Sequence, residues 1–182
     1  MLARIGATDR TVIVVLADHG EGLGDHGEEE HGLLLYEESV AIPFFVVAPG
    51  KIAPGTLVKT PASVVDVVPT VCGLLGIEAP AGMQGRDLFA REEDPTRALY
   101  AETLYPHEEF GWSALYARRE GNDKYIAAPT PELYDLEVDP GERDSLATMQ
   151  GEKTSAMGRA LFEQAQAMVR EENLALAAGF GL

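Results

Sequence analysis

Two continuous apolar runs in the first third of the chain predict strands that are covered on both faces. The runs are TVIVVL at 11–16 and IPFFVVAPG at 42–50. Unbroken stretches of β-branched and aliphatic residues are typical of buried parallel strands. LLLYEES between them fits a short helix, and PASVVDVVPTVCGLLGI fits a longer one with Pro69 in its first turn and an end near Gly76. This alternation predicts an α/β layer with a largely parallel sheet.

The pattern changes to short stretches after Leu88. Three of them alternate apolar and polar residues as antiparallel strands do: ALYAET (98–103), WSALYAR (112–118) and KYIAA (124–128). PELYDL fits a further strand, and the tail from Gly151 is rich in helix-forming residues. We therefore expect an α/β part at 1–90 and, at 91–182, a small antiparallel α+β subdomain with a C-terminal helix.

Composition narrows the classes of partner. Fourteen basic and thirty acidic residues give a net charge of -16, which argues against binding nucleic acid or an anionic membrane. No apolar run approaches the roughly 20 residues of a membrane span, and the first ten residues lack the apolar centre of a signal peptide. The single cysteine, Cys72, lies among apolar neighbours and fits a core position.

The stretch ADHGEGLGDHGEEEHG at 17–32 gathers three of the four histidines directly after the first predicted strand. Asp18 and His19 stand at the carboxyl end of that strand, where open α/β sheets bind ligands. A carboxylate beside an imidazole suits a divalent cation. His31 is placed to return to the same site, where it could hold an anionic oxygen or protonate a leaving group. The alternative is a solvated acidic loop.

Several neighbouring residues have plain structural interpretations. His26 and Glu28 to Glu30 are expected to be solvated, and Glu21 is either a partner of a metal-bound His19 or a loop carboxylate. Tyr36 and Glu37 are expected to begin a packed helix. Asp66 fits a helix cap better than a ligand.

The second part offers less chemistry. His107, in the expected loop ETLYPHEEFGW, lies near Tyr105 and Trp112, where the aromatic residues could line a substrate entrance or make an ordinary subdomain contact. Lys124 reads as a strand residue, and GERDSLA reads as a turn and helix start without chemistry.

Three separated motifs carry a family resemblance. LADHGEGLGDHGEEEHGLLLYEESVAIPFFVVAPG resembles the segment of the type I sulfatases, in the alkaline-phosphatase-like superfamily, that carries the second half of their metal site. VVDVVPTVCGLLGIEAPAGMQGRDLF and KYIAAPTPELYDLEVDPGERDSLA are similar to later family segments, in the same order. The resemblance covers about residues 9–148. It implies the C-terminal part of an α/β/α sandwich followed by a small antiparallel α+β subdomain.

The resemblance also implies a site. Asp18 and His19 would be metal ligands, with Ca²⁺ or Mg²⁺ as the usual ion and Mn²⁺ or Zn²⁺ in the metallophosphotransferase cousins. His31 would be the catalytic residue, at the position of a Lys or His that touches the sulfate. The substrate would be a small-molecule or glycan sulfate ester. Relatives are often periplasmic or extracellular, so localisation stays open.

Two elements of the family's chemistry are missing from the sequence. Sulfatases use a formylglycine made in a C/S-x-P-x-R motif, together with a pair of acidic metal ligands, and both lie upstream of the matching segment. We therefore expect a sulfatase fragment that is inactive alone and lacks the N-terminal half of its domain. The alternatives are a phosphodiesterase or phosphoethanolamine-transferase relative and a non-catalytic sulfatase-like module. ELYDLEVDPGE favours the sulfatase interpretation.

Overall fold

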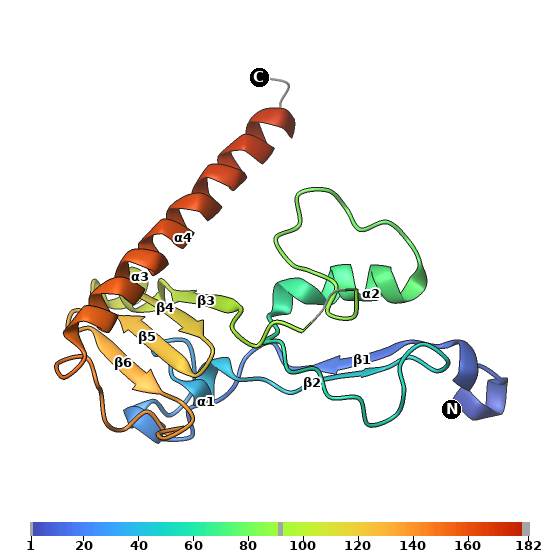
Figure 1. Cartoon of the computed structure of the whole chain (residues 1–182), viewed down its shortest axis with the longest axis horizontal. Helices are drawn as coiled ribbons and strands as arrows, with labels where there is room; N and C mark the ends of the chain where they lie inside the picture. Colours follow the sequence, from blue (N-terminus) through green and yellow to red (C-terminus); the bar gives the residue numbers. More distant parts are fainter. Residues whose placement is uncertain (1, 91–92, 180–182) are drawn as a thin grey trace. The chain divides into compact units, whose positions relative to one another are not determined.

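The computed structural model of the chain describes residues 2–90 and 93–179 (Figure 1). It divides into two compact units. Unit 1 comprises Met1–Gly20 and Ala41–Arg97, and unit 2 comprises Glu21–Val40 and Ala98–Leu182. The segment that follows the Asp18–His19 pair therefore belongs with the C-terminal half of the chain. The expected division into 1–90 and 91–182 stays a prediction.

Unit 1 holds a two-stranded ribbon. The predicted strands are present as β1 (Ile13–Leu16) and β2 (Phe44–Val47), but they pair antiparallel, with Val14 opposite Val46. The expectation of a parallel arrangement is therefore wrong for this pair. A parallel pair needs a crossover connection, usually a helix that returns over the sheet. Here the chain leaves unit 1 after Gly20 and re-enters at Ala41, so β2 runs back along β1.

The helical part of unit 1 follows the sequence closely. A 3-10 turn, η4 (Val64–Asp66), leads into α2 (Val67–Leu75), and Gly76 ends the helix with a φ of 70°. Only glycine adopts this left-handed conformation without steric cost. Cys72 is buried, as expected for a core position. Shorter 3-10 turns at Leu2–Ile5 and Thr8–Arg10 precede β1.

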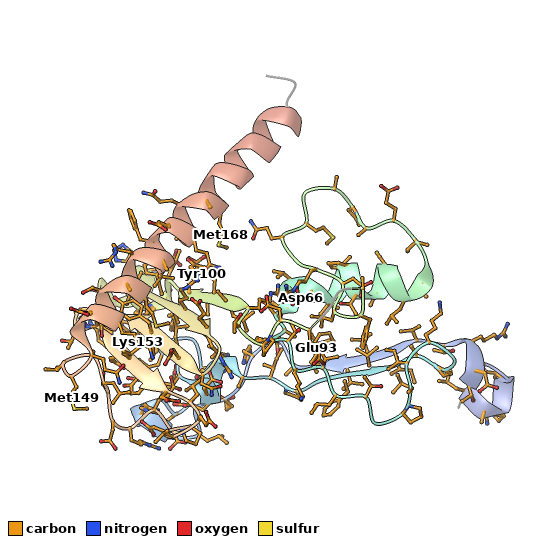
Figure 2. All side chains as sticks on the ribbon, viewed as in Figure 1. Asp66, Glu93, Tyr100, Met149, Lys153 and Met168 are labelled. Atoms are coloured by element: carbon orange, nitrogen blue, oxygen red, sulfur yellow. The ribbon has the colours of Figure 1, made fainter. Side chains whose placement is uncertain are left out.

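Asp66 anchors the start of α2 and is labelled there in Figure 2. Its side chain is fully buried, and it accepts hydrogen bonds from the Arg97 guanidinium at 2.5 and 2.8 Å. The backbone N–H groups of Ser63 and Arg86 donate to the same carboxylate. Burial alone would raise the pKa of Asp66, but these donors outweigh it and hold the pKa below its usual value. The hydrogen bond from the Ser63 N–H agrees with the expectation that Asp66 caps the start of a helix.

Unit 2 is built on a four-stranded antiparallel sheet in the order β3-β4-β5-β6 (Figure 1). Its strands are β3 (Ala98–Thr103), β4 (Leu115–Glu120), β5 (Asp123–Ala127) and β6 (Glu132–Asp135). The remaining elements are η3 (Asp25–Gly27), α1 (Glu37–Val40), α3 (Tyr105–Phe110) and the long α4 (Gly151–Gly179). The predicted antiparallel strands and C-terminal helix are present. The expected loop around His107 is instead the short helix α3.

Alternation along the strands separates two cores. Tyr125 on β5 and Leu133 on β6 pack with Met157 and Leu161 of α4. The side chain of Ile126 points to the opposite face of the sheet, because successive strand residues alternate. There it packs in a second cluster that includes Leu35, Ala117 and Tyr134. The sheet is therefore covered by α4 on one face and by the 21–40 segment on the other.

Within the described residues, none of the helices combines the length and apolarity that crossing a bilayer requires.

Candidate functional site

Asp18 and His19 follow β1 directly, and both side chains are exposed. The His19 N–H donates to Asp18 Oδ1 over 3.2 Å, and His19 Nε2 lies 3.8 Å from Asp18 Oδ2. The two side chains are thus near neighbours that face solvent. Ligand atoms around Ca²⁺ lie about 2.3–2.6 Å from the ion, so two atoms at this separation are close enough to share one ion.

The imidazole of His19 is held in a defined tautomer. Its Nδ1 lies 2.7 Å from the carbonyl oxygen of Gly20. A carbonyl oxygen only accepts, so Nδ1 carries the hydrogen in this contact. Nε2 then has the lone pair that a metal ion requires. The Gly20 carbonyl therefore selects the tautomer in which Nε2 carries the lone pair.

His31 belongs to unit 2 and meets a different acidic residue. Its Nδ1 lies 3.2 Å from Glu21 Oε1, and both side chains are about half exposed. From the sequence, Glu21 was either a partner of His19 or an ordinary loop carboxylate. In the structure its carboxylate contacts His31. Asp18 and His19, in contrast, belong to unit 1.

Glycine and a buried carboxylate shape the loop between these groups. The N–H of Gly22 donates to the Glu30 carbonyl over 2.7 Å, and a Cβ at Gly22 would come within 2.4 Å of the Glu28 carbonyl oxygen. Glu28 was expected to face solvent but is buried. Its carboxylate accepts from the backbone N–H groups of Leu33 and Leu34 at 2.7 and 3.1 Å. Glu29 and Glu30 are exposed, as expected.

His26, like Glu28, was expected to be solvated, and this prediction is wrong. Its ring is stacked on Tyr36 at 3.7 Å between ring centroids, and most of it is buried. Nδ1 lies 2.5 Å from Glu38 Oε1, and Nε2 lies 3.0 Å from the carbonyl oxygen of Glu142. The His26 ring therefore bridges the Glu38 carboxylate and the Glu142 backbone. It ties the loop to the C-terminal part of unit 2.

A buried ion cluster, formed by Lys124, Glu37 and Glu142, makes the same connection. Lys124 is 2% exposed, and its Nζ lies 3.0 Å from both carboxylates. Glu142 also accepts from the backbone N–H of Glu37, and the Arg119 guanidinium reaches Glu37 at 3.0 Å. A buried charge is tolerated only when it is paired. The cluster therefore joins the start of α1, β5 and the turn after β6.

The sequence carried one signal for this cluster. In KYIAA, alternation places Lys124 on the same strand face as Ile126 and Ala128, and a lysine on an apolar face requires a buried partner. Glu142 gave no comparable signal, because its partners lie far away in the sequence. Its backbone has a φ of 50°, which is unusual for a residue with a side chain.

Comparison with known proteins identifies the family. The family model described as Sulfatase matches residues 1–77. The chain is 31% identical to the Delta 4,5-hexuronate-2-O-sulfatase of Bacteroides thetaiotaomicron over 149 residues. The aligned region is 75% of this chain and 30% of that protein. The chain belongs to the sulfatase family.

Solved structures agree with this assignment. A 2-O GAG sulfatase superimposes with a TM-score of 0.71 and 27% identity, over 90% of this chain and 37% of that one. A phosphonate monoester hydrolase from Silicibacter pomeroyi also gives a TM-score of 0.71, with 26% identity over 93% of this chain and 37% of that one. This sulfatase-family chain thus spans about a third of the length of the relatives it matches.

The sulfatase family uses a divalent metal, and the residues here fit part of a coordination shell. Asp18 offers a hard oxygen and His19 offers Nε2. Within 2–90 and 93–179, no group of three or more His, Cys, Asp or Glu side chains is arranged to hold an ion. A hard cation takes about six to eight ligands, so these two residues supply only a fraction of a shell.

Proposed function

We propose that the chain is the portion of a metal-dependent sulfuric ester hydrolase that supplies Asp18 and His19 to the metal and His31 to the sulfate group. The observation that carries the proposal is the exposed Asp18–His19 pair at the end of β1. The Nε2 lone pair of His19 is directed away from the Gly20 carbonyl. The substrate would be a sulfate ester of a small molecule or of a glycan.

In this proposal a bound cation would balance the negative charge that gathers on the sulfate oxygens. Asp18 contributes charge and a hard oxygen to that cation. His19 contributes nitrogen without a change of tautomer, because Gly20 already holds the hydrogen on Nδ1. Asp18 and His19 therefore act by binding and orienting, and neither needs to move a proton.

His31 would act on the anionic group. Glu21 accepts from its Nδ1, so Nε2 can donate to a sulfate oxygen only when the ring carries both hydrogens. The negative charge of Glu21 balances that protonated form. Glu21 is thus a positioning residue for His31, and Glu21→Gln should weaken the sulfate contact less than His31→Gln does.

The chain alone should have no sulfatase turnover. It has two candidate metal ligands and lacks the C/S-x-P-x-R motif from which sulfatases make their nucleophile. Purified chain incubated with an aryl sulfate and Ca²⁺, Mg²⁺, Mn²⁺ or Zn²⁺ should show only the background rate. Metal-dependent hydrolysis well above that background would contradict the proposal.

A chimera tests the site residues directly. The aligned segment of the Bacteroides thetaiotaomicron hexuronate-2-O-sulfatase is replaced by this chain, and hydrolysis of that enzyme's own substrate is measured. Asp18→Asn and His19→Gln should raise the metal concentration required for activity by about 10–100-fold, as the loss of metal-site groups does. His31→Gln should lower kcat by about 100-fold or more, as the loss of a hydrogen-bond donor to developing negative charge does, without changing that metal concentration.

Glu29→Gln is the matched control, because Glu29 is an exposed carboxylate of the same loop. It should leave both quantities unchanged. An active chimera that tolerates Asp18→Asn or His31→Gln would overturn the assigned roles.

The likeness to the phosphonate monoester hydrolase favours a second candidate, a phosphonate or phosphate ester. Assaying an aryl sulfate and an aryl phosphonate monoester in parallel with the chimera separates the two.

A further inference from the structure

Unit 2 contains a cavity of about 540 Å³ between the 26–36 segment and one face of the sheet. This volume falls within the approximate range of 300–1,000 Å³ that is common for small-molecule sites. Leu115, Ile126 and Ala128 form an apolar wall, and Pro106 and Trp112 contribute from α3 and the turn that follows it. All of the lining residues belong to unit 2.

An aromatic group lies at this cavity. Trp112 is 61% exposed although it lines the cavity, and its ring centroid lies 4.9 Å from that of Phe110. Phe110 in turn contacts Tyr105 edge-on, with 6.0 Å between centroids. The indole is therefore supported by other rings and still offers surface to a ligand. Aromatic faces of this kind attract both apolar groups and cations.

The charged groups that line the cavity are mainly acidic. Glu28 and Glu132 both line it, and no lysine or arginine is present among its described lining residues. The Glu28 carboxylate is occupied by backbone N–H groups, and both nitrogens of His26 are occupied by Glu38 and Glu142. Glu132 differs, because the hydroxyls of Tyr36 and Tyr134 both donate to its Oε2, at 2.8 and 2.7 Å. Neither tyrosine engages Oε1.

The two tyrosine hydroxyls fix the position of the Glu132 carboxylate. Burial, together with the neighbouring Glu132 carboxylate, raises the pKa of both Tyr36 and Tyr134, so the phenols stay neutral and donate. The cavity thus presents an anionic oxygen at one point of an otherwise apolar and aromatic wall.

We propose that this cavity binds an organic cation that has an apolar or aryl body, with the ammonium group at Glu132 and the body against Trp112, Leu115 and Ile126. Charge attraction is stronger in a partly desolvated site than in water, and the indole face of Trp112 offers apolar surface to the body of the ligand. Anionic ligands are disfavoured by the two carboxylates. The inference concerns unit 2 alone and does not rest on the proposed sulfatase function.

The only tryptophan of the chain is Trp112, so its fluorescence reports on this cavity. The probes are 4-phenylbutylammonium and the uncharged 4-phenylbutan-1-ol, which have the same aryl body and nearly the same length. The ammonium compound should change the emission saturably and bind about 10-fold or more tightly than the alcohol, as a partly desolvated charge pair allows. Equal affinities, tighter binding of the alcohol, or a signal that does not saturate would overturn the proposal.

Glu132→Gln removes the charge and keeps an acceptor oxygen for the two tyrosines. It should lower the ammonium affinity to that of the alcohol, so that the affinity ratio falls to about 1 as the charge attraction is lost. Glu102→Gln is the matched control, because Glu102 is an exposed carboxylate that accepts from the hydroxyl of Tyr100. It should preserve the ratio. An unchanged ratio in Glu132→Gln would overturn the role of the carboxylate.

A second variant keeps the test decisive if Glu132→Gln fails to fold. Ala128→Phe places a ring in the cavity wall and should weaken both probes about 10-fold or more, because it fills space that the aryl body requires. Folding of each variant is checked by far-UV circular dichroism. Unchanged binding of both probes to a folded Ala128→Phe variant would show that they bind elsewhere.

Discussion

The strands of unit 1 are continuous apolar runs and those of unit 2 alternate apolar with polar residues, yet the best-buried strand residues belong to unit 2. In the β1–β2 ribbon, Val15 is 54% exposed and Phe45 is 63% exposed. In the sheet of unit 2, Leu133 is 0% exposed and Ile126 is 2% exposed. The apolar character of a strand therefore does not decide its burial. Its burial depends on the layers that cover it, which in unit 2 are α4 and the 21–40 segment.

The same contrast applies to charge. Both units bury a carboxylate with a cationic partner, Asp66 with Arg97 in unit 1 and Glu142 with Lys124 in unit 2. Asp66 has several donors, which hold its pKa low, whereas burial dominates at Glu142 and raises its pKa. The two units should therefore respond to substitution and to pH in opposite ways.

The largest effect is expected from Lys124→Met. It leaves Glu37 and Glu142 without their shared cation and should destabilise unit 2 by about 3–5 kcal/mol, as other broken buried pairs do. Urea unfolding followed by Trp112 fluorescence measures this loss. Lys153→Met is the control, because Lys153 (labelled in Figure 2) makes a partly exposed pair with Asp123 that should contribute no more than about 1 kcal/mol. Equal losses would mean that the cluster is not stabilised by its pairing.

Truncation of strand residues tests the difference in burial itself. Ile126→Ala should cost about 2–5 kcal/mol, because it opens a cavity in the core of unit 2. Val15→Ala in β1 should cost about 0.5 kcal/mol or less, because its side chain is already largely hydrated. Hydrogen exchange resolves the two units in one experiment. A cost for Val15→Ala close to that of Ile126→Ala would show that β1 is covered in solution.

Asp66→Asn should destabilise unit 1 by about 1–3 kcal/mol at pH 7, because it removes a charged acceptor from Arg97 and from two backbone N–H groups. The pKa of folded Asp66 lies below 3.8, so its ionised form contributes stability that is lost as the pH falls through the folded value. The difference between wild type and variant should shrink below about pH 4. Exchange rates in α2 at pH 7 and pH 3 provide the measurement.

Glu142→Gln should have a smaller effect than Asp66→Asn and the opposite pH dependence. Burial raises the pKa of folded Glu142 above 4.5, so the stability it contributes is present below that value and is lost as the pH rises through the folded pKa. The variant should therefore be destabilised by about 1–2 kcal/mol near pH 4 and by less at pH 7. Unfolding midpoints at both values give the sign. A penalty that grows towards pH 7 would contradict it.

Local sequence determined the elements of this protein and its most informative loop. Apolar runs, alternation and Gly76 located β1, β2, the four strands of unit 2, α2 and α4, because these signals act over a few residues. Asp18 and His19 could be selected from their place after a strand, and the resemblance to sulfatases was readable from three motifs. These inferences needed no knowledge of distant contacts.

Only the tertiary structure decided how the elements meet. The antiparallel pairing of β1 with β2 depends on the path of residues 21–40 through the other unit. His26 and Glu142 lie 116 positions apart in the sequence, and Glu37 and Glu142 lie 105 apart. A histidine or glutamate has the same local signature whether it is solvated or buried. Its environment depends on which distant segment packs over it, and no short window of sequence contains that information.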